Sequence, residues 1–145
     1  MRPEALPNPI PNLSNFDVVC LNAGNWDAAV PTPVDQYEAN LRSTLDVVFE
    51  SRPTARVVLV TTTPVAPFPE FGTANQFIVL YNEVLRRLSA DHPQVTICDL
   101  YQYVVDNTDS DPWSDGTHFT PAFSEELAGQ VYFSVIAVLP AAHMD

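Results

Sequence analysis

The sharpest candidate for chemistry in this sequence is a carboxylate that precedes a histidine by three residues. Asp115 and His118 stand in the polar segment Asp-Gly-Thr-His. On a loop, such a carboxylate can accept a hydrogen bond from the imidazole Nδ1, which leaves Nε2 free to act as a general base. A surface turn with a solvated histidine has the same spacing, because Asp and Gly are common turn residues. The spacing alone leaves both interpretations open.

A second candidate site follows a short apolar segment that ends near residue 22. Asn22, Gly24 and Asn25 stand together there. Glycine permits close approach of the backbone, and asparagine amides can donate hydrogen bonds to a developing oxyanion, although these residues also form ordinary turns. Trp26 and Trp113 could line an apolar or sugar-stacking wall, or they could simply cover the core.

Short apolar segments alternate along the chain with amphipathic ones, and this order indicates an α/β fold with a parallel sheet and right-handed crossovers. In such sheets ligands bind beyond the carboxyl ends of the strands, where the candidate residues stand. The pattern predicts strands at 17–22, 56–62 and 95–100, and helices at 34–51, 74–90 and 121–139. We expect no internal repeat.

Residue spacing also predicts which side chains are buried. Cys20 and Cys98 fall inside strands that we expect to be covered on both faces, as small core residues rather than nucleophiles. In the helix at 74–90, Leu80 is expected on the buried face and Asn82 off it.

Length and composition limit the classes of protein. The 145 residues suit one domain, which we place at 17–145, and the four prolines of residues 1–16 predict an extended arm. The net charge is −12 and all six basic residues are Arg, so we expect no nucleic-acid partner. We see no membrane-spanning apolar run and no signal peptide.

No cofactor or metal is expected. Two cysteines with this spacing do not make a zinc site. A flavodoxin-like nucleotide binder is disfavoured, because no glycine-rich phosphate loop follows any expected strand.

Three segments carry a resemblance to a known family, and they are Asp17–Asp27, Val58–Pro64 with Tyr81-Asn82, and Ser114–Pro121. They resemble the SGNH, or GDSL-type, esterase and acyltransferase superfamily, and look closest to the SGNH domains of membrane acyltransferases that modify cell-surface polysaccharides. The first segment is similar to the family's third block, a strand that ends in Gly-x-Asn-Asp. The second is similar to its fourth strand and following helix, and the third to its fifth block, Asp-x-x-His.

The resemblance implies a three-layer, flavodoxin-like parallel sheet and a Ser-His-Asp triad that acts on acyl esters. His118 would activate the serine and Asp115 would orient His118. The oxyanion and substrate region would include Gly24, Asn25, Trp26 and Asp27, with Trp26 in the register of the family's asparagine. The implied substrate is an acylated carbohydrate or a small ester, and an extracytoplasmic location would follow if the chain belongs to a membrane acyltransferase.

The sequence departs from the family's pattern at its start. The family carries its serine in a Gly-Asp-Ser motif after a first strand, and its sheet has five strands, whereas this sequence shows only the last three strand–helix units. We therefore expect the C-terminal portion of such an enzyme, inactive alone for lack of the nucleophile. The exposed edge of the strand at 17–22 would be covered by a partner chain, a second copy, a swapped segment or the arm at 1–16. The alternative is a non-catalytic glycan-binding or interaction module of the same fold.

Overall fold

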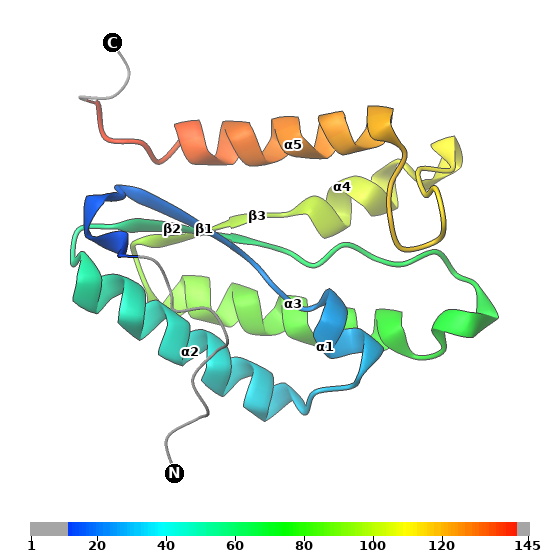
Figure 1. Cartoon of the computed structure of the whole chain (residues 1–145), viewed down its shortest axis with the longest axis horizontal. Coiled ribbons are helices and arrows are strands. Elements are labelled where there is room, and N and C mark those ends of the chain that lie inside the picture. The colour runs from blue at the N-terminus through cyan, green and yellow to red at the C-terminus, as the bar shows by residue number, and fades with distance from the viewer. Residues whose placement is uncertain (1–11, 142–145) are drawn as a thin grey trace.

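The protein is a three-layer α/β structure, seen here in a computed structural model that describes residues 12–141. A parallel sheet forms the middle layer, with α1, α2 and α3 on one face and α5 on the other (Figure 1). The strands are β1 (Val18–Asn22), β2 (Arg56–Val60) and β3 (Val95–Cys98), and the helices are α1 (Asn25–Ala29), α2 (Val34–Ser51), α3 (Ala74–Asp91), α4 (Leu100–Asp106) and α5 (Pro121–Ile136). This confirms the predicted fold class.

The strands lie in the order β1-β2-β3, so β2 is central and both its neighbours are parallel to it. Val19 of β1 stands opposite Val57, which in turn stands opposite Val95 of β3. Because all strands run the same way, the loops that follow them meet at one edge of the sheet. Within residues 12–141, no strand pairs with the outer side of β1.

Two apolar cores lie on the two faces of the sheet. One packs α2 and α3 against it through side chains such as Leu45 and Leu88, and the other packs α4 and α5 through Val104 and Phe123. After the exposed Arg56 that begins it, the central strand is buried, and Val57, Val58 and Leu59 have no exposed surface. The helices on both faces of the sheet therefore pack against the central strand and cover it.

Two predictions of burial were wrong. Strand β1 is only partly covered, and Cys20 is exposed whereas Cys98 is buried, because β1 lies at the edge of the sheet rather than inside it. In α3, Leu80 is 41% exposed and Asn82 is 1% exposed. A small rotation of the helix decides whether Leu80 or Asn82 faces the sheet. Asn82 is the buried one, because its amide forms hydrogen bonds with backbone groups there.

The N-terminal arm was predicted over residues 1–16, and the structure describes only its last residues. Leu13–Asn15 forms a short 3₁₀ helix, capped by the Asn12 side chain, and Leu13 is buried in the core of the α2 and α3 face. Residues 1–11, with the prolines of the arm, lie outside the described residues. No helix between residues 12 and 141 is both long and apolar enough to cross a membrane.

Candidate active site

Asp115 and His118 lie in a loop between α4 and α5 that is closed at its base. The backbones of Trp113 and Phe119 form an antiparallel bridge, and their rings stack with centroids 6.2 Å apart. The Ser114 N–H donates to the His118 carbonyl over 2.8 Å. The loop therefore has a fixed shape although both Asp115 and His118 are exposed.

The carboxylate of Asp115 binds both the ring and the backbone of this loop. Its Oδ2 lies 2.7 Å from Nδ1 of His118, and its Oδ1 accepts from the backbone N–H groups of Thr117 and His118 over 3.0 and 2.7 Å. These hydrogen bonds, led by the one from the His118 N–H, hold the pKa of Asp115 well below its usual range. Among residues 12–141, Nε2 of His118 has no hydrogen-bond partner.

The loop that follows β2 holds the Asp115–His118 loop in place. The Ala66 N–H donates to the carbonyl of Gly116 over 2.8 Å. Gly116 has a φ of +89°, and a Cβ added there would lie 2.6 Å from Cε2 of Phe71. Trp113 donates its indole N–H to the Pro64 carbonyl, so it fixes this loop and does not line the pocket beside His118.

Buried hydroxyl groups fix the loop that follows β1. The Tyr37 and Thr62 hydroxyls both donate to the carbonyl of Ala23, over 2.8 and 2.7 Å. Tyr81 stacks on Tyr37 with ring centroids 4.2 Å apart and donates to the carbonyl of Asp27. Burial, with the charge of Asp27 and despite a hydrogen bond to Thr62, raises the pKa of Tyr37 far above its usual value, so it stays a neutral donor.

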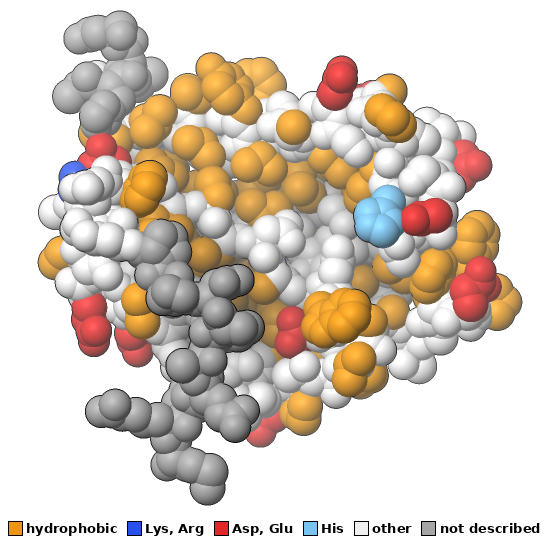
Figure 2. Space-filling model, viewed as in Figure 1, with side chains coloured by type: hydrophobic (Ala, Val, Ile, Leu, Met, Phe, Trp, Pro, Cys, Tyr) orange, Lys and Arg blue, Asp and Glu red, His pale blue; other side chains and the backbone are white. Residues whose placement is uncertain are grey.

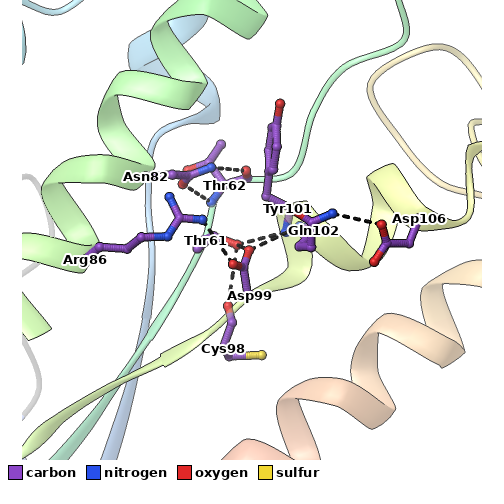
Figure 3. Close-up of polar contacts among 9 residues, drawn as sticks. All are labelled: Thr61, Thr62, Asn82, Arg86, Cys98, Asp99, Tyr101, Gln102 and Asp106. Carbon is purple, nitrogen blue, oxygen red and sulfur yellow. Dashed lines mark hydrogen bonds and ion pairs between the residues drawn. The ribbon is translucent and has the colours of Figure 1, made fainter.

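A polar network behind these loops joins α3 to the carboxyl ends of β2 and β3 (Figure 3). The amide of Asn82 donates to the carbonyl of Thr62 and accepts from its N–H, over 2.9 and 2.8 Å. Asp99 accepts from the Thr61 hydroxyl and from the Arg86 guanidinium. Because Thr62 also binds Ala23, Asn82 supports the loop after β1 from behind, a role that its position on the helix did not suggest.

A pocket of about 600 Å³ opens between these loops. Of the residues predicted for the site, Asn25, Trp26 and His118 line it, and Asp115 lies behind His118. Gly24 and Asp27 do not line it. Gly24 has a φ of +135°, and a Cβ there would lie 2.3 Å from Oγ1 of Thr62, so its place in the loop requires glycine.

Sequence analysis missed the other walls of the pocket. Val65 and Ile78 form apolar walls, and Glu70 and Phe71 come from a 3₁₀ helix at Pro69–Phe71. The proline-rich loop gave no periodic signal for that short helix. No group of three or more His, Cys, Asp or Glu side chains within the described part of the chain could hold a metal ion.

The chain resembles known proteins in sequence pattern and in fold. Residues 2–125 match the model of the GDSL-like lipase/acylhydrolase family. A proposed platelet activating factor from Streptococcus pneumonia superposes with a TM-score of 0.72 and 21% identity, over 81% of this chain and 59% of that one. A lipase/acylhydrolase from Enterococcus faecalis superposes with a TM-score of 0.72 and 20% identity, over 86% of this chain and 63% of that one.

A third solved structure, of a peptidoglycan O-acetylesterase, gives a TM-score of 0.67 and 15% identity, over 87% of this chain and 39% of that one. The chain thus spans less than two thirds of the length of these proteins. No curated protein matches the sequence. At such identities the superpositions show a shared fold only. The match over residues 2–125 shows the family. The chain belongs to the GDSL-like lipase/acylhydrolase family.

Proposed function

We propose that this chain carries the acid–base pair of an SGNH-type ester hydrolase or O-acyltransferase that acts on acyl esters of carbohydrates. The observation that carries the proposal is the 2.7 Å contact between Asp115 and Nδ1 of His118, with His118 on the wall of a pocket. Asp115 keeps the Nδ1 proton in place, so Nε2 is the nitrogen that accepts a proton.

In the proposed reaction, His118 takes the proton of a serine hydroxyl as its oxygen attacks the carbonyl carbon of the ester. The proton then passes to the oxygen of the leaving alcohol, and the acyl group stays on the serine. Water, or the hydroxyl of an acceptor, then attacks the acyl carbon and gives its proton to His118. His118 returns the proton to the serine oxygen as the bond to the acyl group breaks and the acid or the new ester leaves. In the loop that follows β1, Asn25 and Trp26 line the pocket and would face the developing oxyanion and the substrate.

We propose that the serine reaches His118 on a segment that pairs with the outer edge of β1. Two observations within residues 12–141 support this: Nε2 has no hydrogen-bond partner there, and β1 pairs with a strand on one side only. Hydrophobic side chains gather in the middle of the face shown in Figure 2. Helix α5, which packs on β2 and β3, carries apolar side chains that are partly or largely exposed, namely Val131, Tyr132, Phe133 and Val135.

A carbohydrate substrate is supported by one side chain and one structural neighbour. Trp26 is 82% exposed on the rim of the pocket, where its ring could stack on a sugar. The neighbour is described as a peptidoglycan O-acetylesterase. The second candidate function is a glycan-binding module without catalysis. It is favoured by the exposed Trp26 in the same pocket as His118, whose Nε2 contacts no hydroxyl of residues 12–141.

The test compares hydrolysis of a short acyl ester by residues 1–145 and by the protein with any in-frame Gly-Asp-Ser segment encoded upstream. We expect no turnover dependent on His118 from residues 1–145. With the serine segment present, His118→Ala should lower kcat by about 100-fold or more, whereas His92→Ala should leave it unchanged. Turnover by residues 1–145 that His118→Ala abolishes would contradict the missing nucleophile. Absence of turnover in the longer protein would favour the binding module.

A further inference from the structure

The pocket beside His118 has an unusual distribution of charge. Glu70 is its one carboxylate, and it is exposed at the start of the pocket wall made by the 3₁₀ helix Pro69–Phe71. Between residues 12 and 141 no side chain forms an ion pair with Glu70. An unpaired carboxylate on the rim of an apolar pocket leaves a negative potential that no neighbouring residue offsets.

Among the residues that the structure describes, no arginine or lysine lines the pocket to balance this charge. The sequence contains no lysine, and none of the described arginines lines the pocket. Four of them bind carboxylates elsewhere and one begins β2, at the opposite end of the strand from the pocket. They are Arg42 and Arg87 with Glu38, Arg52 with Asp17, Arg86 with Asp99, and Arg56.

The aromatic side chains of the pocket suit a cation as well. Trp26 presents most of its ring to solvent, and Phe71 lines the same pocket. Aromatic faces attract ammonium groups by about 0.5–1 kcal/mol at exposed sites, and tryptophan does so best. The walls formed by Val65 and Ile78 would meanwhile cover an apolar group that carries the charge.

We propose that this pocket binds the part of the substrate that carries an ammonium charge on an apolar group, and that Glu70 sets this preference over anionic groups. The inference rests on the proposed function, because it assigns a substrate class to the same site. On a carbohydrate ester, the ammonium would be an amino group of an apolar aglycone. The volume of about 600 Å³ is within the range of small-molecule sites.

The test uses three probes that share a benzyl group and differ in charge: benzyltrimethylammonium, benzyl alcohol and phenylacetate. None of them is an ester, so binding is measured without any requirement for a nucleophile. The readout is the NMR signal of the Trp26 indole N–H, assigned with Trp26→Phe. The second tryptophan, Trp113, is an internal control because its indole N–H is bound to Pro64.

We expect benzyltrimethylammonium to bind about fivefold or more tightly than phenylacetate at low salt, with benzyl alcohol between them. Glu70→Gln should bring the three dissociation constants to within about twofold of one another. Glu50→Gln removes the same charge from an exposed position on α2 and should leave the order unchanged.

Three results would overturn the proposal. They are no shift of the Trp26 signal with any probe, equal or reversed affinities in the unaltered protein, and an unchanged order in Glu70→Gln. The last result would assign the preference to the net charge of −12 rather than to Glu70. Failure of ester hydrolysis leaves this binding test intact, so the two proposals fail separately.

Discussion

At the scale of single residues, the two carboxylate oxygens of Asp115 have different hydrogen-bond partners. One oxygen holds the imidazole of His118, and the other binds the backbone N–H groups that give the loop its shape. Loss of the negative charge therefore affects both the orientation of the ring and the fold of the loop. Protonation of Asp115 at low pH should therefore weaken the hydrogen bonds that hold both the His118 ring and the loop.

The first prediction concerns pH. The pKa of Asp115 is lowered in the folded state, so the unfolded chain takes up this proton first as the pH falls. The stabilisation is therefore present at neutral pH and is lost progressively below about pH 4, the usual pKa range of a carboxyl group. Urea unfolding at pH 7 and pH 3 should show a smaller loss of unfolding free energy in Asp115→Asn than in the unaltered protein.

Asp46→Asn is the matched control for this measurement. Asp46 is exposed on α2, and its replacement should leave the acid dependence as it is in the unaltered protein. An equal loss of stability between pH 7 and pH 3 in Asp115→Asn and the unaltered protein would contradict the role of Asp115.

At the scale of elements, the contact between Gly116 and Phe71 joins the loop of His118 to the loop after β2. In Gly116→Ala the new methyl group would meet the ring of Phe71 in a backbone conformation that alanine disfavours. We expect a cost of about 1–3 kcal/mol in the free energy of unfolding. Urea unfolding measures it.

Gly129→Ala provides the comparison. Gly129 lies within α5, and a Cβ there would meet no atom within 4 Å beyond the neighbouring backbone of its own helix, so the change should stabilise the protein by up to about 1 kcal/mol. Equal changes in the free energy of unfolding for the two variants would show that the Phe71 ring moves aside without cost and does not fix the loop.

The elements themselves could be predicted from the sequence because their signal is periodic. The helices at 34–51 and 74–90 agree with α2 and α3 almost to the residue. The third predicted strand was too long, since Leu100 already begins α4. Periodicity says how a segment is patterned and not what its neighbours are, which is why exposed Cys20 was placed in the core.

The candidate site could be predicted only where a motif marked it. The spacing of Asp115 and His118 anticipated their contact. No spacing in the sequence shows that Phe71 and Glu70 come to the same pocket as His118, because that depends on the path of a proline-rich loop. Asn82 was missed for a related reason: only the fold reveals the backbone groups that it satisfies.

At the scale of the whole molecule, the outer edge of β1 is the surface on which the proposed assembly depends. Cys20 is exposed on that strand, while Cys98 is buried on β3, so the two thiols report on different places. Partial burial, with the nearby Cys98, raises the pKa of Cys20, which slows its reaction with thiol reagents without preventing it.

The third prediction concerns coverage of this edge. If a second copy covers β1, labelling of Cys20 by a thiol reagent at fixed pH should slow as the protein concentration rises. If the segment with the serine covers it, labelling should slow at every concentration once that segment is present. Labelling of Cys98 should stay slow throughout. Rapid labelling of Cys20 under all these conditions would mean that the edge remains open.

The contact between Phe71 and Gly116 has a consequence for how this protein can change. The ring that walls the pocket also supports the loop that carries the proposed base. A smaller residue at position 71 would enlarge the pocket and also remove the support behind His118. A substitution of Phe71 that admits new substrates should therefore also lower the catalytic rate. Further substitutions in the loop around Gly116 would be needed to restore that rate. Substitution at Val65, which lines the pocket and is only half-buried, leaves the contact between Phe71 and Gly116 in place.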